Sequence, residues 1–470
     1  MSDLLTLCLT DLIDRLRSGA TSPVELMSAT LDRIAATHEA LNAVVAMRDR
    51  EALLADARTA ESRLRRGAGR PLEGVPLGVK DLEDAAGLVT SHGSLPFREQ
   101  IATRDSTQVH RLKAAGAIVV GKTNAPEFGY TAITKNLVYG VTRSPWNVAH
   151  TPGGSSGGSA AALAGCVLPL VTASDGGGSI RIPASFVGAF GLKPSFGRVP
   201  RGPFDQWEYG DTAVFGPLTK TVEDAALMLD QVAGPSAYDP NSLPAPGLSY
   251  AEAIREPLPR GLRIGFSPDL GYAVVQSDVA AAVASAVRVF EQQGHRVELL
   301  QEGPPQLGRE WAIIGAFELA THLHPYLPEH EDKFGRGFLW GVKHGWQMTP
   351  EAWGEAAKLR ARLGNWCAET FERYDLLVTP TVPYDPPPAG GPFPSETEGR
   401  PQVLAGVAAF TIPFNLSWHP AATVRVGLSR MGLPIGMQIV GPRHRDDLVL
   451  RAARDFERER PWHPEWPTVG

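Results

Sequence analysis

The sequence contains little cysteine and no large excess of charge of either sign. Its three cysteines, Cys8, Cys166 and Cys367, are widely spaced and odd in number, so they make neither a disulfide framework nor a set of zinc ligands. Lysine and arginine total 45 against 51 aspartates and glutamates, a net charge of −6, and proteins that bind nucleic acid usually carry a basic patch or a high pI. We therefore expect a protein of a reducing cytoplasm, with no metal and no nucleic-acid partner.

The sequence also lacks a long apolar segment. No run of apolar residues reaches the roughly 18 expected of a transmembrane helix, and the N-terminus MSDLLTLCLTDLIDRLRSG has no basic segment followed by a long apolar one. We expect no signal peptide and no membrane partner, which again favours a cytoplasmic location. Glycine and proline, in contrast, are abundant at 49 and 40 residues, so turns and close backbone approaches are frequent.

Short apolar runs alternate with helical ones in the first half of the chain. VPLGVKD (75–81), GAIVVGKTN (116–124) and VLPLVTASD (167–175) are typical of buried strands, and the segments 105–116 and 156–166 between them are typical of helices. This alternation predicts an α/β protein with a mixed central β-sheet flanked by helices. In such folds the reactive groups gather at the carboxyl ends of the strands.

Residues 303–373 interrupt this pattern with a helical segment that is rich in tryptophan and phenylalanine. We interpret it as a helical insertion near the substrate entrance of one large α/β unit. The sequence shows no internal repeat, so we take 1–470 as a single domain whose core region is about 70–235. Whether the aromatic side chains form the substrate pocket or only a core stays open, because an aromatic stripe at helical spacing fits both.

Two glycine clusters that carry serine stand close together in GGSSGGSAAALAGCVLPLVTASDGGGSIRIP (153–183). Glycine this dense around serine indicates a backbone that closely approaches a phosphate or a reacting carbonyl. A phosphate loop would need the G-x-x-x-x-G-K-[ST] spacing, which is absent. The stretch 153–157 matches the G-x-S-x-G nucleophile elbow, but a proline-rich loop rather than a strand precedes it, and no later histidine stands in an obvious motif.

A third interpretation makes the two clusters act together, with a lysine as the base. A serine hydroxyl is a poor nucleophile until a neighbour accepts its proton. Lysine can do so when desolvation lowers its pKa from about 10.4 toward neutrality. Lys80 suits this role, since it follows the apolar GVPLGV and ends a predicted buried strand. The alternative is an ordinary surface or ion-paired lysine.

Four longer motifs support the third interpretation: GVPLGVKD, GKTNAPEFG, PGGSSGGSAAALAG and SDGGGSIRIPASFVGAFGLKPSFGRVP. Together they resemble the amidase signature family, and the resemblance extends over nearly the whole chain, to GLPIGMQIVGP (432–442) and the closing helix. It implies the amidase signature fold and the hydrolysis of linear, non-peptide carboxamide C–N bonds without a cofactor. By the resemblance, Ser179 is the nucleophile that forms an acyl-enzyme, Ser155 is the bridging serine held by a cis peptide bond, and Lys80 is the base.

The residues around these three are expected to support the reaction. We predict that backbone N–H groups before the nucleophile bind the tetrahedral oxyanion, an approach that side chains would obstruct. The glycines concerned are Gly176, Gly177 and Gly178. Asp175 and Arg181, which flank the nucleophile, are interpreted as an ion pair that supports the loop.

The first serine cluster is expected to serve both the site and the helix that follows it. Gly154 eases the crowding before Ser155. Ser156 and Ser159 are predicted to cap the alanine-rich helix, and Ser156 is also expected to touch the site.

Two departures from the family pattern concern the substrate. Where the family commonly has N-x-x-G-x-P-A, this chain has NLSWHPA (415–421), with Trp418 in place of glycine, and Arg425 stands where a proline is usual. Trp418 could narrow the acyl pocket, and Arg425 could bind an anionic group of the substrate. Local repacking would explain both changes equally well, so the two alternatives stay open.

The family includes aryl acylamidases, fatty acid amide hydrolases, nylon-oligomer cyclic dimer hydrolases and the catalytic subunits of amidotransferases. We expect a small-molecule substrate that is a small or bulky hydrophobic or aryl amide, or an amide oligomer, and the resemblance implies a homodimer. One alternative is the catalytic (A-type) component of a glutamine-dependent aminoacyl-tRNA amidotransferase, which requires partner subunits. Another is a non-catalytic binding protein on the same scaffold, which the retention of Lys80, Ser155 and Ser179 disfavours.

Overall fold

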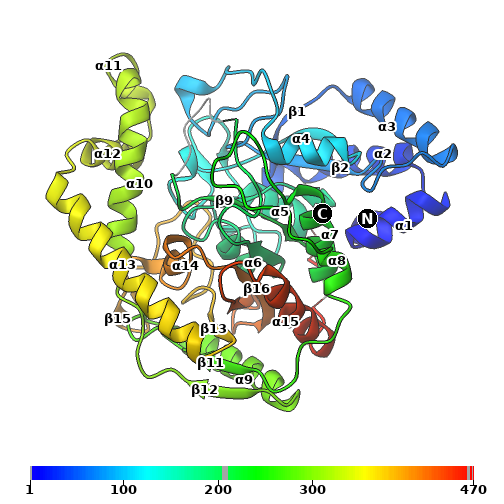
Figure 1. The fold of residues 1–470 in the computed structure, drawn as a ribbon. Helices are drawn as coiled ribbons and strands as arrows, with labels where there is room; N and C mark the ends of the chain where they lie inside the picture. The colour runs from blue at the N-terminus through cyan, green and yellow to red at the C-terminus, as the bar shows by residue number, and fades with distance from the viewer. Residues whose placement is uncertain (1–2, 204–209, 463–465, 468, 470) are drawn as a thin grey trace.

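The computed structural model describes residues 3–203, 210–462, 466–467 and 469. Over these residues the predicted α/β architecture is confirmed, since a mixed central sheet is flanked by helices (Figure 1). The central sheet has seven strands in the order β10-β8-β16-β17-β13-β11-β12. In that order they are β10 (Leu218–Thr219), β8 (Phe190–Lys193), β16 (Ala421–Leu428), β17 (Pro434–Val440), β13 (Leu376–Pro380), β11 (Arg263–Phe266) and β12 (Arg296–Leu299).

The C-terminal hairpin of β16 and β17 fills the middle of this sheet. β16 pairs antiparallel with β8 on one side and with β17 on the other, so that Ala421 lies opposite both Lys193 and Val440. β17 pairs antiparallel with β13, while β13, β11 and β12 run parallel. The hairpin therefore joins strands from the first half of the chain to strands from the second in one sheet, and residues of both halves pack in the same hydrophobic cluster.

A second, four-stranded sheet carries the predicted base. Its order is β1-β3-β2-β6, with β2 parallel to both β3 and β6. The strands are β1 (Val44–Met47), β3 (Ile118–Thr123), β2 (Pro76–Lys80) and β6 (Leu170–Val171). Lys80 is thus the last residue of a parallel strand, at the edge where polar side chains are expected to meet.

The strand predicted over 167–175 is shorter than expected. Only Leu170–Val171 (β6) join the four-stranded sheet, whereas Ser174–Asp175 (β7) turn away and pair with β9 (Val214–Phe215). The apolar run therefore ends where the chain leaves the sheet. This turn carries Asp175 and the glycines after it toward the carboxyl end of β2.

The helices begin and end where local chemistry predicts. α1 (Leu9–Ser18) ends at Gly19, which has a φ of 75°. α2 (Pro23–Leu41) has Ser22 as N-cap, whose side chain accepts a hydrogen bond from the Glu25 N–H. The remaining long helices outside 303–373 are α3 (Arg50–Arg65), α4 (Thr107–Ala114), α5 (Gly157–Ala164), α6 (Arg181–Val187), α7 (Val222–Val232), α9 (Ser277–Gln292) and α15 (Asp446–Glu459).

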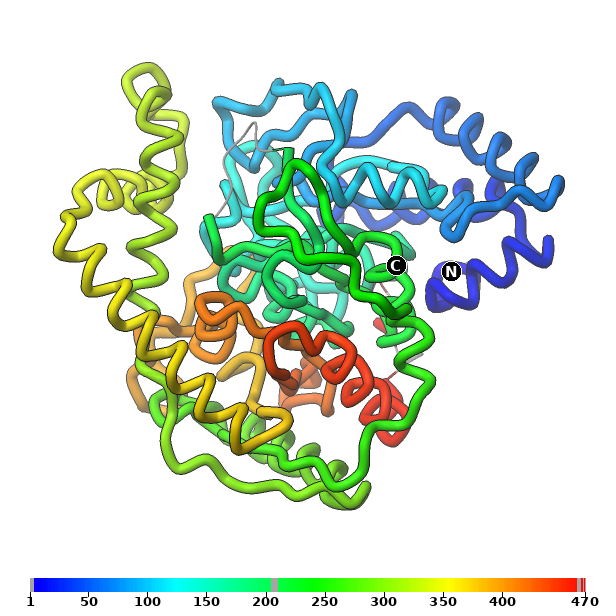
Figure 2. The backbone as a smooth tube through the Cα atoms, viewed as in Figure 1, coloured from blue at the N-terminus to red at the C-terminus, as the bar shows by residue number. Residues whose placement is uncertain are grey.

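The aromatic segment forms helices along one side of the molecule, which we call the aromatic arm (308–373; Figures 1 and 2). They are α10 (Gly308–Leu323), α11 (Leu327–His330), α12 (Arg336–Gly345) and α13 (Pro350–Arg373). Phe338 is buried and stacks on Phe128, with ring centroids 5.2 Å apart, whereas Trp340, Trp346 and Trp353 are exposed. The helical segment is therefore present, and its aromatic side chains divide between a core and the surface.

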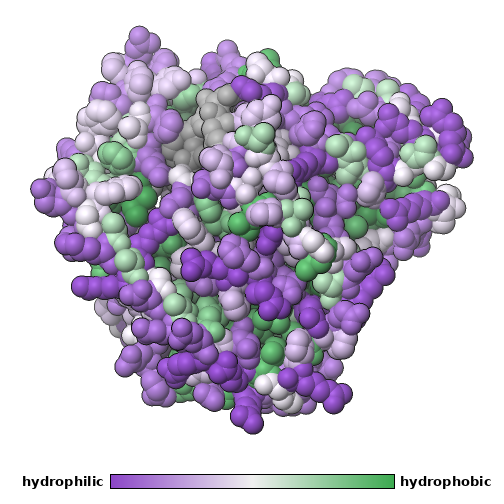
Figure 3. Space-filling model, viewed as in Figure 1, coloured by the Kyte–Doolittle hydropathy of each residue, from purple (hydrophilic) through white to green (hydrophobic). Residues whose placement is uncertain are grey.

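The face seen in Figure 3 is largely hydrophilic, with apolar side chains in scattered groups. In the described part of the chain, none of the helices combines the length and apolar character needed to cross a membrane. The three cysteines are free thiols, and each is buried.

Candidate active site

Lys80 ends a strand that runs through the core. Leu77 and Val79 of the same strand are fully buried, and 1% of Lys80 is exposed. The Lys80 N–H donates to Thr172 Oγ1 (2.9 Å) just beyond the neighbouring strand β6. The strand therefore holds the lysine stem within apolar surroundings and leaves its amino group at the carboxyl edge of the sheet.

The Lys80 amino group is surrounded by hydroxyl and carbonyl oxygens. Nζ donates to Ser155 Oγ (2.8 Å), Ser156 Oγ (2.8 Å), Ser174 Oγ (2.9 Å) and the Ser174 carbonyl (3.3 Å). Burial lowers the pKa of Lys80 to about 7, because desolvation of the ammonium outweighs the attraction of nearby carboxylates. Burial therefore favours the neutral amine, which has a lone pair that can accept a proton.

Ser155 follows a cis peptide bond, which joins it to Gly154. The cis bond expected from the family resemblance is therefore present, and Ser155 is buried beside Lys80. Gly154 packs closely against a neighbouring loop, where an added β-carbon would lie 2.9 Å from the Thr131 carbonyl oxygen. A side chain at this position would thus displace the loop that faces Ser155.

Ser156 and Ser159 do not cap the alanine-rich helix as predicted. Ser156 occupies the N-cap position of α5, but its hydroxyl makes no capping bond and contacts Lys80 instead. Ser159 lies inside the helix and donates to the Thr172 carbonyl (2.8 Å). The buried amino group competes successfully for the Ser156 oxygen, so the expected contact of Ser156 with the site is the one that forms.

Ser179 lies between β7 and α6 and is half-buried. Its carbonyl oxygen accepts a hydrogen bond from the Ser156 N–H (3.3 Å). This bond ties the two glycine–serine clusters together, although an entire helix separates them in the sequence. The fold therefore brings Lys80, Ser155, Ser156 and Ser179 into one region.

Asp175 and Arg181 form the expected ion pair, and neither side chain is exposed. Arg181 donates to both carboxylate oxygens, from Nη2 to Oδ1 (2.9 Å) and from Nε to Oδ2 (3.0 Å). Burial alone would raise the pKa of Asp175, but the Arg181 guanidinium holds it well below its usual range. The carboxylate also accepts the N–H groups of Gly178 (2.7 Å) and Ile180 (3.2 Å), so it fixes the backbone on both sides of Ser179.

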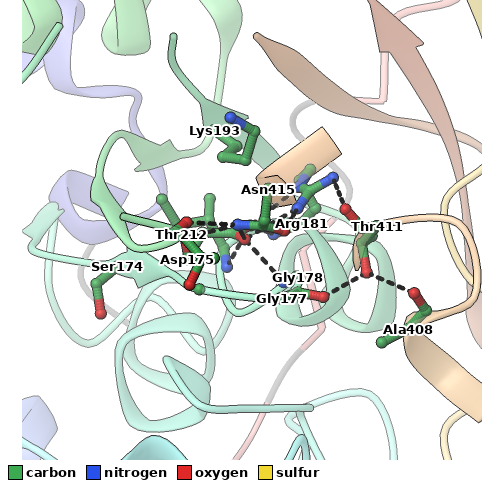
Figure 4. A network of polar contacts seen from close by, with 12 residues as sticks. Ser174, Asp175, Gly177, Gly178, Arg181, Lys193, Thr212, Ala408, Thr411 and Asn415 are labelled. Carbon is green, nitrogen blue, oxygen red and sulfur yellow. Dashed lines mark hydrogen bonds and ion pairs between the residues drawn. The ribbon is translucent and has the colours of Figure 1, made fainter. Parts of the chain in front are cut away.

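The ion pair is the centre of a larger polar network (Figure 4). Arg181 also donates to Asn415 Oδ1 (2.6 Å), Gln438 Oε1 (2.7 Å) and the Thr411 carbonyl (3.0 Å). Asn415 Nδ2 donates in turn to Asp175 Oδ1 (2.8 Å). The loop that carries Ser179 is thus attached to the C-terminal part of the chain by buried, charge-assisted hydrogen bonds.

Hydrogen bonds from within the protein hold the glycine run before Ser179. The Gly178 N–H already donates to Asp175 Oδ1 (2.7 Å). The Gly176 carbonyl accepts from Trp311 Nε1 (2.7 Å), and the Gly177 carbonyl accepts from Thr411 Oγ1 (2.6 Å). The oxyanion role of the three glycines stays a prediction, and the Gly178 N–H is the one of the three whose hydrogen bond to the supporting carboxylate competes with that role.

Trp418 is held in place by three contacts. Its indole N–H donates to the Asp211 carbonyl (2.7 Å), its ring stacks on Phe196 at a centroid distance of 5.1 Å, and the Arg360 guanidinium lies 5.4 Å above the ring. These contacts favour a packing role for Trp418. Because the residue is only half-buried, its contact with a substrate stays a prediction.

Arg425 is buried in β16. Its Nη2 donates to the Trp462 carbonyl (2.6 Å), and its guanidinium lies 5.5 Å from the centre of the Trp146 ring. This arrangement satisfies the arginine within the protein. It favours local repacking over the binding of an anionic substrate group.

Three residues of the site are absent from the sequence-based predictions. Ser174 touches Lys80, Thr411 holds Gly177, and Trp311 holds Gly176. Ser174 stands directly before Asp175 in TASDGGGS, so its place in that motif was an available signal. Thr411 and Trp311 lie far from the motif, and no local pattern distinguishes them.

Comparison with known proteins agrees with this geometry. The Amidase family model matches residues 25–450. The chain belongs to this family. It is 37% identical over 475 residues to an acylamidase of Rhodococcus erythropolis, covering 97% of this chain and 96% of the relative. It is 33% identical to the A-type component of the glutamyl-tRNA(Gln) amidotransferase of Roseiflexus castenholzii, covering 100% of this chain and 99% of that one.

Solved structures of amidases superpose closely on this one. A bacterial aryl acylamidase of the amidase signature family has a TM-score of 0.93 at 29% identity and covers 98% of both chains. A 6-aminohexanoate cyclic dimer hydrolase has a TM-score of 0.85 at 30% identity, covering 98% of this chain and 99% of that one. The family, fold and enzyme class expected from the sequence are confirmed: this amidase is an amide hydrolase. In its described residues, no group of three or more histidine, cysteine, aspartate or glutamate side chains is arranged to hold a metal ion.

The lowered pKa of Lys80 predicts how activity depends on pH. Because Lys80 must be neutral to act as the predicted base, kcat/KM should rise with pH through about 7 and level off above it. Protonation is favoured by Asp175 and Glu83, whose charges raise this pKa against burial. Initial rates on an aryl amide between pH 5 and 9 measure the profile, and Lys80→Ala should lower the plateau by about 10²–10⁴-fold.

Lys193 supplies the control for this profile. Burial lowers its pKa to about 7 as well, but its amino group donates to the Pro194 carbonyl (2.9 Å) and does not contact the serines. Lys193→Met should therefore keep the ascending limb near pH 7. If the ascending limb instead disappears in Lys193→Met and persists in Lys80→Ala, the titrating group is Lys193 and the assignment to Lys80 is wrong.

The buried ion pair predicts a strong effect on stability. Arg181→Met leaves the Asp175 carboxylate buried without its guanidinium, and such losses cost about 3–5 kcal/mol of unfolding free energy. Asp175→Asn combined with Arg181→Met removes both charges and should cost less than the sum of the two single changes. Urea unfolding of the four proteins checks this, and strictly additive costs would contradict the coupling.

Proposed function

We propose that this amidase is a cofactor-independent serine amidohydrolase that cleaves a linear, non-peptide carboxamide through an acyl-enzyme on Ser179. The observation that carries the proposal is the environment of Lys80. A buried lysine whose amino group contacts three serine hydroxyls, and whose pKa is lowered to about 7, is suited to accept a proton from serine.

Hydrogen-bond accounting supports Ser155 as the proton relay. An ammonium has three N–H donors and no acceptor. When it loses a proton, the neutral amine keeps two donors and gains a lone pair that can accept a hydrogen bond from a neighbouring hydroxyl. Ser155 Oγ and Ser156 Oγ both lie 2.8 Å from Nζ. The Ser156 hydroxyl also has the Ser174 carbonyl as an acceptor (3.3 Å), whereas the Ser155 hydroxyl has no other acceptor among the described residues. We infer that Ser155 donates to neutral Lys80 and thereby leaves its own oxygen able to accept the proton of Ser179.

The proposed reaction uses only the amide, water and the side chains of Ser179, Ser155 and Lys80. Ser179 Oγ attacks the amide carbonyl carbon, its proton passes to Ser155, and the Ser155 proton passes to Lys80. The tetrahedral intermediate then breaks its C–N bond, and the relay runs backward to protonate the leaving nitrogen, since an amide anion is a poor leaving group. A water molecule attacks the resulting ester by the same relay and releases the acid.

The preferred substrate is an aryl or otherwise bulky hydrophobic amide, or an amide oligomer. The acylamidase, the aryl acylamidase and the cyclic dimer hydrolase named above support this class, as does the aromatic arm beside the glycine run. The A-type component of an amidotransferase is the second candidate, because one such protein is 33% identical over the full chain. A non-catalytic binding protein is disfavoured by the intact contact of Lys80 with Ser155.

The nucleophile can be identified by covalent labelling. A fluorophosphonate should react with Ser179 alone among the site serines, and Ser179→Ala should abolish both labelling and amide hydrolysis. Peptide mass spectrometry locates the label. A label on Ser155 or Ser156 with Ser179 unmodified would overturn the assignment, and Lys80→Ala should slow labelling because the relay is lost.

The two candidate functions predict different behaviour of the isolated chain. A hydrolase should release acid and amine from simple amides without partner subunits, with the highest kcat/KM among aryl or bulky hydrophobic members of a panel that also holds aliphatic amides and lactams. Liquid chromatography of the products measures this. Inactivity on the whole panel, together with glutamine-dependent ammonia transfer after addition of amidotransferase partner subunits, would favour the second candidate.

A further inference from the structure

The peptide groups between Gly176 and Ser179 are each held at the carbonyl oxygen. The Gly176 carbonyl accepts from Trp311 Nε1 (2.7 Å), the Gly177 carbonyl from Thr411 Oγ1 (2.6 Å), and the Gly178 carbonyl from the Ile182 N–H (2.7 Å). None of the cis peptide bonds found in the described residues lies between Gly176 and Ser179, so these peptides are trans. In a trans peptide the N–H points opposite to the carbonyl, and each donor therefore also fixes the direction of one N–H.

The N–H groups opposite these carbonyls divide into two kinds. The Gly178 N–H is used by Asp175 (2.7 Å), so the peptide between Gly177 and Gly178 is held at both ends. Among the residues that the structure describes, the N–H groups of Gly177 and Ser179 have no protein acceptor. These two donors flank the fixed one and are available to a developing negative charge.

Trp311 differs from the other two donors in its origin. Ile182 belongs to the helix after the nucleophile, and Thr411 belongs to the polar network of Figure 4. Trp311 comes from α10 of the aromatic arm and is half-buried. Its ring also packs on Gly177, where an added β-carbon would lie 2.5 Å from Cζ2, so the ring and residue 177 are fitted to each other.

We propose that Trp311 is a positioning residue of the amidase reaction, which orients the Gly177 N–H toward the oxyanion by holding the Gly176 carbonyl. The inference rests on Ser179 being the nucleophile. When Ser179 Oγ bonds to the carbonyl carbon, the carbonyl electron pair moves onto oxygen, and the Gly177 N–H donates to that oxygen together with the Ser179 N–H. The aromatic arm is thus linked directly to transition-state stabilisation and serves more than hydrophobic packing.

The test uses Trp311→Phe in the full-length protein, because phenylalanine keeps a ring against Gly177 and removes the N–H. Loss of one oxyanion donor typically lowers kcat by about 10²–10³-fold, and a donor that is only misdirected should lose less, about 10- to 100-fold. We expect that fall in kcat on 4-nitroacetanilide with little change in KM. Trp353→Phe, on the exposed side of the aromatic arm, should leave both parameters unchanged.

Ligand binding separates positioning from a general structural effect. Phenylboronic acid adds to the Ser179 oxygen through boron, its new charge lies on tetrahedral boron and its oxygens, and the serine proton passes to the base. Benzamide has the same ring, and its binding is compared in the Ser179→Ala background, where it cannot be attacked and stays trigonal. Trp311→Phe should lower the affinity for phenylboronic acid by the same factor as it lowers kcat, and it should leave the affinity for benzamide unchanged. Titration calorimetry measures both affinities. Equal weakening of both ligands, or no weakening of either, would overturn the proposal.

Two further proteins keep the test decisive. Ser179→Ala should abolish the binding of phenylboronic acid, and if it does not, the assignment of the nucleophile is wrong. If Ser179→Ala abolishes this binding but Trp311→Phe keeps the wild-type kcat and affinity, only the role of Trp311 is refuted. If Trp311→Phe does not fold, 3-benzothienylalanine at position 311 keeps the shape of the indole without its N–H. It should give the same selective loss, and an unchanged affinity for phenylboronic acid would refute the role of Trp311.

Discussion

The site depends on one amino group that is solvated by protein oxygens instead of water. Lys80 loses its hydration because β2 carries it into the core, and three serine hydroxyls and a carbonyl replace the water. Those oxygens come from the cis peptide segment, the first residue before α5 and the short strand β7. Hydroxyls can reverse their donor direction, whereas a carboxylate would hold the lysine as an ammonium. Because its neighbours are serines and not carboxylates, the Lys80 amine can take up and release a proton.

The buried ion pair of Asp175 and Arg181 gives the opposite kind of environment nearby. Its charges stay fixed, because each is fully paired and further hydrogen-bonded to Asn415 and Gln438. The network joins the loop that carries Ser179 to β17 and to α14 (Ile412–Leu416), so the C-terminal hairpin supports this loop. One pair of charged groups thus organises the backbone, while the lysine among hydroxyls remains chemically adjustable.

Features with a local physical cause were predictable from the sequence. Ser22 caps α2 because a hydroxyl before proline can accept the free N–H groups of a first turn, and Lys80 ends a strand because the apolar run before it ends there. Predictions failed where a distant group competes for the same atom. The Ser156 oxygen was expected to cap its own helix and instead accepts a hydrogen bond from Lys80, 76 residues away in the sequence. The competition can also be local, because the Gly178 N–H donates to Asp175, three residues before it.

The sequence by itself determined the family, the α/β fold and the residues that form the centre of the site, since long ordered motifs carry that information. Only the tertiary structure decided which hydroxyls Lys80 contacts and which backbone N–H groups remain free. The orientation of a peptide group follows from the donors around it, and here they come from remote positions: Thr411 is 234 residues from Gly177, and Trp311 is 135 residues from Gly176. No local pattern encodes such a contact, because it forms only when the aromatic arm and the C-terminal segment pack against the glycine run.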